Sequence, residues 1–260
     1  MIASITVLVP VRGQATFLAD AITSLRAQTC TDWQALLLTC DDATLHAANT
    51  HIDGDVRMQV MQAGGDEIPS LAHAANTLQT EFLCVLDGDD LLEPDALTAL
   101  RDALLAAPDA GMAYGRHTLI DAAGKPLGPG PLCELPYSAD ALLLDFMTGP
   151  LRLFRTAAYR DCGGYDPATA DAADYDLCLR LSETCDIVHV PQSLYRRRIH
   201  AASAELARWS EGIEARYAAF VRAVERRGLD QAYDCALQIE SWHILQPLQP
   251  FGGVGILRSP

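Results

Sequence analysis

The sequence predicts an α/β fold in which a mostly parallel sheet carries helices on both faces. Short apolar runs alternate with stretches of helical periodicity through the first half of the 260 residues. The runs at 5–9 and 82–86 are continuously apolar, which is typical of strands buried on both faces. Because half of the residues are hydrophobic, the chain can form one large domain, or a domain with an appendage.

Four strands and three helices are expected in the first half. In chain order they cover residues 5–9 (strand), 17–28 (helix), 35–38 (strand), 56–61 (strand), 68–78 (helix), 82–86 (strand) and 94–105 (helix). Apolar residues at helical spacing indicate the first helix, and Pro69 is compatible with the second because it falls in its first turn. Glu93 and Asp95 suit the positive end of the third.

The second half is less regular. Residues 124–136 are rich in Gly and Pro and predict a loop, either a plain surface loop or a mobile one beside the site. Helices near 139–146 and 174–182 and a strand at 187–190 follow. A helix over 203–227, ended by Gly228, is expected to pack on the core, with an interface to a partner chain or a membrane as the alternative.

Charge and hydropathy exclude several classes of protein. The net charge is −15, from 19 basic and 34 acidic residues, whereas a nucleic-acid-binding protein needs a basic face. No apolar run approaches the ~20 residues of a membrane-spanning helix, and residues 1–11 lack the features of a signal peptide. The eight cysteines contain no CxxC pair, which favours reduced, buried thiols. A cytoplasmic location is therefore expected.

Acidic side chains follow two of the predicted strands at the edge where an open parallel sheet binds its ligands. These carboxylates are Asp41, Asp42, Asp87, Asp89 and Asp90. Like charges in one place raise each other's pKa unless a cation compensates, and a divalent ion bound by oxygen atoms would do so. A helix cap would explain one of the three acids within 87–90 but not all of them, so the pattern favours a metal site.

Several segments, in a fixed order, resemble family 2 of the inverting glycosyltransferases, which have the GT-A fold. They are ITVLVPV, LLLTCDDAT, EFLCVLDGDDLLEPDAL, FRTAAYRDCGGYDPATADAADYDLCLRLSE and LYRRRIHAAS, spanning about residues 4–203. The resemblance implies a GT-A domain over 1–202, with a nucleotide-binding half over about 1–115 and an acceptor half over about 116–202. Residues 203–260 would form a C-terminal helical extension.

The resemblance also implies a role for each matching residue. The nucleotide-binding residues would be Pro10, Val11, Arg12, Asp41, Asp87 and Arg198. A divalent metal, Mn²⁺ or Mg²⁺, would be held by Asp87, Asp89 and His200, and Asp174 falls where the family has its catalytic base. Asp41 would accept a hydrogen bond from the base, and Arg198 would face the diphosphate. Without the resemblance, Asp174 would be interpreted as a helix cap and His200 as an ordinary histidine.

The implied function is transfer of a sugar from a nucleoside-diphosphate sugar, with a UDP-sugar favoured, to a hydroxyl of a saccharide or lipid-linked acceptor. Polysaccharide or glycoconjugate synthesis, with possible peripheral membrane association, is the expected setting. One alternative is a sugar-nucleotide-binding protein with weakened catalysis, because Ala173 replaces the family's Glu and no Lys or Arg occurs over 58–100. Asp171 is a candidate substitute for that Glu. The second alternative is a nucleotidyltransferase, for which Arg12-Gly13 is a minimal version of the expected loop.

Overall fold

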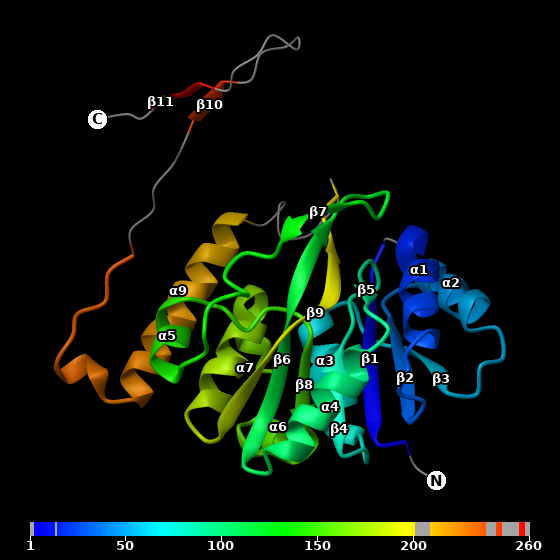
Figure 1. The fold of residues 1–260 in the computed structure, drawn as a ribbon, viewed down its shortest axis with the longest axis horizontal. Coiled ribbons are helices and arrows are strands. Elements are labelled where there is room, and N and C mark those ends of the chain that lie inside the picture. Colours follow the sequence, from blue (N-terminus) through cyan, green and yellow to red (C-terminus); the bar gives the residue numbers. More distant parts are fainter. Residues whose placement is uncertain (1–2, 14, 201–208, 238–242, 246–254, 258–260) are drawn as a thin grey trace.

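The computed structural model describes residues 3–13, 15–200, 209–237, 243–245 and 255–257. Within these ranges the main sheet has nine strands (Figure 1). Across the sheet they are β3 (Met58–Gln62), β2 (Trp33–Thr39), β1 (Ile5–Val11), β4 (Phe82–Val85), β8 (Arg152–Arg155), β6 (Ala110–Ile120), β9 (Asp186–Arg198) and β5 (Leu91–Leu92), with β7 (Pro126–Pro129) paired to β6.

The first four strands of this order form the predicted parallel half. All seven residues of β1 are buried, because β2 and β4 flank it in parallel and helices cover both faces. Val7 lies opposite Ala35 of β2 and Cys84 of β4. The four strands expected in the first half are therefore confirmed. The third begins later than predicted, because Val56 lies in the preceding turn and is 93% exposed.

The remaining strands make the sheet mixed, with both parallel and antiparallel pairs. Strand β8 is antiparallel to β4 and β6, and β5 is antiparallel to β9, whereas β6 and β9 run parallel. Strands β6 and β8 were not predicted, because their sequences contain glycine and arginine in place of a continuous apolar run. Strand β9 extends well beyond the predicted 187–190 and includes the arginines 196–198. The predicted loop 124–136 contains the short strand β7.

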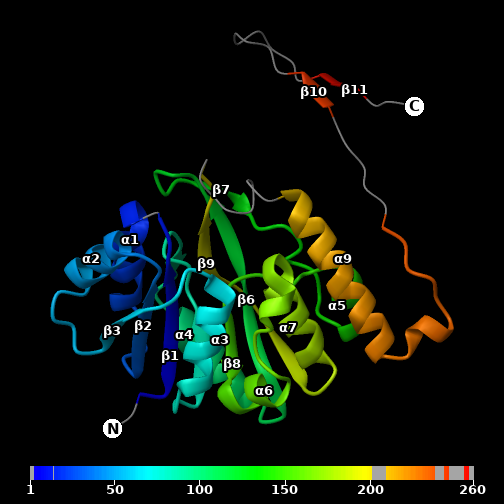
Figure 2. The same cartoon turned by 180° about the vertical axis from the view of Figure 1, so that it is seen from behind.

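Helices cover both faces of the sheet, as predicted. One core contains β1 side chains with α1 (Ala15–Arg26), α2 (Asp42–Ile52) and α4 (Ala96–Ala106). The opposite core contains α3 (Glu67–Thr77), α5 (Ala139–Leu144), α6 (Thr156–Asp161), α7 (Ala173–Ser182) and α9 (Trp209–Arg226). Figure 2 shows α3, α6 and α7 in front of the sheet. Short 3₁₀ helices are η1 (Pro167–Ala172) and η2 (Leu229–Gln231).

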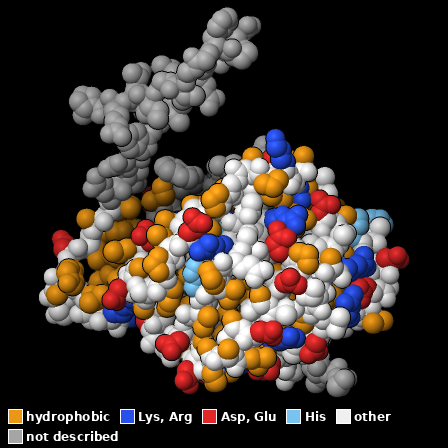
Figure 3. Space-filling view, viewed as in Figure 1, with side chains coloured by type: hydrophobic (Ala, Val, Ile, Leu, Met, Phe, Trp, Pro, Cys, Tyr) orange, Lys and Arg blue, Asp and Glu red, His pale blue; other side chains and the backbone are white. Residues whose placement is uncertain are grey.

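Helix α9 packs against the core, as the sequence predicts. Its residues Ala219, Ala223 and Val224 are buried in the second core, and Gly228, with φ of 66°, follows its end. The expected helical residues 203–208 lie outside the described part of the chain. Apolar side chains gather over α5 and α9 on the surface (Figure 3).

Beyond α9, β10 (His243–Leu245) and β11 (Gly255–Leu257) form a small antiparallel sheet, a feature that the predicted helical extension did not include. No helix in the described ranges is both long and apolar enough to cross a membrane.

Candidate active site

The acidic loop that follows β4 is hydrogen-bonded to the end of β1. The N–H of Leu86 donates to the carbonyl of Leu8 at 2.9 Å, and the N–H of Gly88 donates to the carbonyl of Pro10 at 3.2 Å. A Cβ atom at Gly88 would lie 2.9 Å from that carbonyl oxygen, so the loop approaches β1 more closely than a side chain allows. This contact places Asp87 and Asp89 at the carboxyl edge of the parallel strands, as predicted.

Asp89 and His200 lie in direct contact, as expected for residues that share a site. Nε2 of His200 is 2.9 Å from Oδ2 of Asp89, and the imidazole ring stacks at a tilt on Phe17 with the centroids 5.0 Å apart. His200 follows β9 while Asp89 follows β4, so the sheet brings together residues that are 111 positions apart. The third predicted metal ligand, Asp87, is partly buried in the same loop.

Arg198 holds this loop through hydrogen bonds. Its side chain is 2% exposed, and the guanidinium donates to the carbonyl of Asp89 at 2.8 Å and to that of Ala122 at 2.9 Å. It also lies 3.0 Å from a carboxylate oxygen of Asp20. The guanidinium of Arg198 therefore contacts other residues of the protein and lines neither of the two cavities described below. The sequence, by contrast, predicts that Arg198 faces a diphosphate.

Asp90 extends the same network inward. It is buried, accepts a hydrogen bond of 2.6 Å from the N–H of Arg198, and also interacts with the hydroxyl of Tyr195. Burial, followed by the charge of Asp89, raises the pKa of Asp90 to about 7, against the opposing hydrogen bonds. The hydroxyl of Tyr195 accepts a hydrogen bond from the N–H of Asp87 at 3.3 Å. Tyr195 therefore connects the two acids.

A cavity of about 420 Å³ opens beside the loop. Its polar walls are formed by Glu67, Asp87, Arg152, Tyr165, Asp174 and Tyr195. Burial, followed by the charges of Asp90, Glu67, Asp89 and Asp174, raises the pKa of Asp87 well above its ordinary value. A cluster of carboxylates with this electrostatic cost is stabilised by any cation that enters it.

Asp174 lies in the wall of this cavity and does not cap its helix. The residue before α7 is Ala172, which makes no side-chain capping bond, whereas Asp174 lies in the first turn. The hydroxyl of Tyr165 donates to Oδ1 of Asp174 at 2.9 Å, and a nitrogen of Arg152 lies 2.6 Å from Oδ2. The Asp174 side chain remains 46% exposed.

Tyr165 is positioned by the glycine turn before it. Gly163 and Gly164 have φ values of 92° and 65°, and Arg180 donates to the carbonyl of Gly164 at 2.7 Å. Arg180 is itself held by Asp176, 2.7 Å away on the same helix. The N–H of Tyr165 donates to the hydroxyl of Tyr159 at 2.9 Å. This turn therefore directs the Tyr165 side chain toward Asp174.

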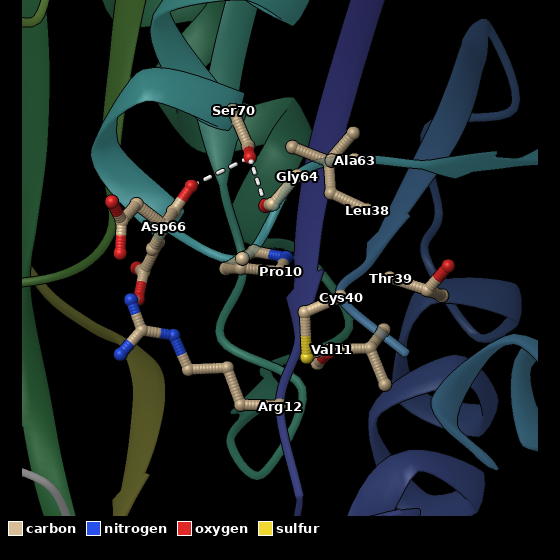
Figure 4. Close-up of a pocket in the computed structure, with 12 residues that line it drawn as sticks. Pro10, Val11, Arg12, Leu38, Thr39, Cys40, Ala63, Gly64, Asp66 and Ser70 are labelled. Atoms are coloured by element: carbon tan, nitrogen blue, oxygen red, sulfur yellow. Dashed lines mark hydrogen bonds and ion pairs between the residues drawn. The ribbon is translucent and has the colours of Figure 1, made fainter. Parts of the chain in front are cut away.

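A second cavity, of about 270 Å³, lies between the ends of β1 and β2 and the start of α3 (Figure 4). Pro10, Val11 and Arg12 line it, in agreement with their predicted position. Ser70 closes its far side by donating to the carbonyls of Gly64 at 3.1 Å and Asp66 at 2.6 Å (Figure 4).

Asp41 does not line either cavity. It is the N-cap of α2, where its Oδ1 accepts a hydrogen bond of 2.7 Å from the N–H of Thr44, and this bond is the largest cause that lowers the pKa of Asp41. The sequence did not predict α2, so it did not identify Asp41 as its cap. The contact of Asp41 with a nucleotide base stays a prediction.

Glu67 joins the two cavities and was missed by the sequence analysis. It lines both of them, and it forms an ion pair with Arg12. Burial raises the pKa of Glu67, Arg12 opposes this, and Asp174 and Asp89 add to it. The rule that ligand-binding residues follow parallel strands would have identified Glu67, because it comes soon after β3. Arg152 could not be found in this way, because its strand was not predicted.

The donor atoms at the loop are suited to a divalent ion but are not arranged as a finished site. Among the residues that the structure describes, no group of three or more His, Cys, Asp or Glu side chains is placed to hold a metal ion. Asp89 and His200 are the nearest pair of candidate ligands, with Asp87 two residues away, and both oxygen and imidazole donors suit Mn²⁺. The raised pKa of Asp87 indicates the charge that such an ion would neutralise.

Residues 6–163, more than half of the chain, match the family described as Glycosyl transferase family 2. The chain is 25% identical over 207 residues to Chondroitin synthase of Escherichia coli, which covers 78% of this chain and 30% of that protein. It is 22% identical over 231 residues to Hyaluronan synthase of Pasteurella multocida, which covers 86% of this chain and 23% of that protein. The chain thus spans less than a third of the length of either relative.

Two solved structures are similar in fold. S. aureus TarS 1–349 in complex with UDP-GlcNAc has a TM-score of 0.67 at 14% identity, covering 85% of this chain and 66% of that one. Mannosyltransferase PcManGT from Pyrobaculum calidifontis, in complex with GDP-Man and Mn²⁺, has a TM-score of 0.63 at 14% identity, covering 90% and 70%. The predicted GT-A type of fold is confirmed by these likenesses. The chain belongs to glycosyl transferase family 2.

Proposed function

We propose that this chain is a metal-dependent inverting glycosyltransferase that moves a sugar from a nucleoside-diphosphate sugar, with UDP-sugars favoured, to a hydroxyl acceptor. The observation that carries the proposal is the cavity in which Asp87 and Asp174 share a wall, with the cavity of Arg12 adjoining it at Glu67. A nucleotide in the smaller cavity would extend its diphosphate toward the acidic loop, and its sugar would then lie beside Asp174.

The acceptor and setting are proposed from the relatives. Two relatives are named for chondroitin and hyaluronan synthesis, and a third, from Myxococcus xanthus, is an O-antigen biosynthesis protein. We therefore propose a saccharide or lipid-linked saccharide as the acceptor, in the synthesis of a polysaccharide or glycoconjugate. The cytoplasmic location expected from the sequence is part of the same proposal.

Asp87, Asp89 and His200 would hold the divalent ion, Mn²⁺ or Mg²⁺. When bound, such an ion supplies positive charge that stabilises the leaving diphosphate. The protein's part is to hold the ligands ready: Arg198 fixes the backbone of Asp89 through a bond of 2.8 Å, and Gly88 keeps the loop against β1. Support for a metal ion comes from the acidic cluster itself, whose members raise the pKa of Asp87.

Asp174 would act as the base. It would accept the proton of the acceptor hydroxyl, whose oxygen attacks the anomeric carbon as the bond from that carbon to the diphosphate oxygen breaks. One displacement inverts the configuration, so a single base suffices and no covalent intermediate is required. The half-exposed side chain of Asp174 leaves lone pairs free for this proton beyond those used by Tyr165 and Arg152.

A second candidate function is sugar-nucleotide binding with weakened transfer. The residue before Asp174 is Ala173, which is buried in the second core and has no carboxylate to offer to the cavity. Asp171, the candidate substitute, lies on the exposed side of η1. This candidate predicts donor binding without measurable transfer.

The test combines binding with transfer. Thermal unfolding is measured with UDP, GDP and their sugar derivatives, with and without Mn²⁺, because a ligand that binds the native state raises its melting temperature. Transfer is then assayed across saccharide acceptors for the wild type, Asp174→Asn and the matched control Asp102→Asn, an exposed acid on α4. The proposal expects Asp174→Asn alone to lose transfer while it still binds the nucleotide. Full transfer by Asp174→Asn would overturn the assigned base, and binding without transfer by the wild type would favour the second candidate.

A further inference from the structure

A buried arginine lies against Asp174, and the proposed transfer assigns it no role. Arg152 is the first residue of β8, and its side chain is only 9% exposed. One guanidinium nitrogen lies 2.6 Å from Oδ2 of Asp174, and another donates to the carbonyl of Thr148 at 2.9 Å. The ring of Phe146 lies 5.7 Å from the guanidinium carbon. The guanidinium is therefore held by contacts other than Asp174.

Arg152 stays charged in this position. Burial, the largest single influence, lowers the pKa of Arg152, but the charge and hydrogen bond of Asp174, together with Cys178 and Tyr165, raise the pKa overall. The hydroxyl of Tyr165 binds the other carboxylate oxygen at 2.9 Å. Each oxygen of Asp174 thus contacts one partner, and the two partners come from separate elements, a strand and a glycine turn.

We propose that Arg152 is a positioning residue that holds the carboxylate of Asp174 correctly oriented to accept the proton of the acceptor hydroxyl. The inference rests on the proposed function, because it requires Asp174 to be the base. Asp174 lies in the first turn of a helix whose preceding residues make no side-chain cap, so its own element orients it weakly. Arg152 lies on a strand hydrogen-bonded to β4 and β6 on its two sides, and a rigid element is the better support for a catalytic geometry.

The charges around Asp174 explain why a cation is needed. The ionisable groups that interact with it are Arg152 on β8, Tyr165 after the glycine turn, Glu67 on α3, Asp87 after β4 and Cys178 on α7. Arg152 is the only cation among these five described groups, whereas Glu67 and Asp87 are acids. Without Arg152, the carboxylate of Asp174 would face two acids with no cation among these groups.

The experiment compares Arg152→Met, Arg152→Lys and the control Arg155→Met. Arg155 is three residues along the same strand, and it pairs with Glu81 at 3.2 Å, away from the cavity. For Arg152→Met we expect kcat to fall on the order of 100-fold, the loss typical of a displaced catalytic group, with little change in donor KM. Arg152→Lys should recover part of the activity, because it restores the charge without the planar fork.

Each other outcome is decisive. Wild-type kcat for Arg152→Met would overturn the inference. Weaker UDP binding with unchanged kcat would also overturn it, because Arg152 would then contact the diphosphate. If Arg152→Met does not fold, Arg152→Lys and Tyr165→Phe carry the test, since each keeps the size of its side chain and alters one contact of Asp174. Absence of transfer by the wild type would overturn both proposals, whereas wild-type transfer with unaltered Arg152 variants overturns only this one.

Discussion

Nε2 of His200, which follows β9, lies 2.9 Å from Oδ2 of Asp89, which follows β4. The pair leads to the first prediction. We expect Asp89→Asn and His200→Ala each to lose most of the rise in melting temperature that Mn²⁺ adds to UDP, because each variant would remove one of the side chains proposed to hold the ion. Thermal unfolding with UDP, with and without Mn²⁺, measures the difference.

The matched control for Asp89→Asn is Asp102→Asn on α4. Asp102 is an exposed acid that pairs with Arg101 at 3.0 Å, far from the loop in the fold. It changes the net charge by the same amount and should keep the full response to Mn²⁺. A full response in both Asp89→Asn and His200→Ala would show that neither residue binds the ion.

The second prediction concerns the glycine between the two acids. Gly88→Ala places a Cβ atom 2.9 Å from the carbonyl oxygen of Pro10, and the contact is with backbone that cannot rotate away. We expect the loop to move from β1, with a loss of about 1–3 kcal/mol in the free energy of unfolding and at least a tenfold loss in UDP affinity. Denaturant unfolding and calorimetric titration test this. Gly212→Ala on α9, where nothing lies within 4 Å, should lose neither quantity.

The third prediction concerns the ion pair between the two cavities. At the proposed nucleotide site Glu67 would compete with a diphosphate for Arg12 and would also repel the diphosphate, so Glu67→Gln should bind UDP more tightly than the wild type, by up to about tenfold (~1.4 kcal/mol). Arg12→Met should bind UDP more weakly, because it removes the cation itself. The two variants of this ion pair should therefore change the affinity for UDP in opposite directions. Calorimetric titration at low salt measures both, and weaker binding by Glu67→Gln would mean that the carboxylate assists the nucleotide.

The first half of the chain was predictable because strands such as β1 and β4 are mainly apolar runs. All seven residues of β1 are buried, so sequence and burial coincide there, and the acids that follow two of the strands could be placed at one edge. Strands β6 and β8 could not be predicted in the same way, since they pair antiparallel and contain arginine and glycine. The buried Arg152 is compensated in its strand by the carboxylate of Asp174 on α7 and by the carbonyl of Thr148, and the sequence pattern indicates neither contact.

The site residues also differ in how far the sequence could predict them. Pro10, Val11 and Arg12 line a cavity where the end of a predicted strand places them. The pairing of Asp89 with His200 required the resemblance, because nothing local to either residue indicates the other. Arg198 illustrates the limit: a run of three arginines indicates an anion site, yet Arg196 pairs with Glu93 and Arg198 with Asp20. Only the tertiary fold determines which acid a cation meets.

The last prediction concerns His117 on β6, a buried histidine packed against Gly130 and Gly149. Among the described atoms neither ring nitrogen has a hydrogen-bond partner, and a Cβ at Gly149 would lie 2.8 Å from the ring. Burial, followed by the charges of Arg197 and Arg152, lowers the pKa of His117 to about 4 from its ordinary 6.5. The folded protein therefore holds this ring neutral over a range in which the unfolded chain binds a proton.

Stability from this group is fully present above pH 6.5 and is lost as the pH falls from 6.5 toward 4, because unfolding then takes up a proton. We expect the melting temperature of the wild type to fall more steeply over that interval than that of His117→Gln, which keeps a neutral side chain at every pH. His46→Gln, on the exposed side of α2, is the control and should follow the wild type. Parallel curves for wild type and His117→Gln would mean that other groups carry the pH dependence, because only a ring that titrates differently in the two states can change the slope.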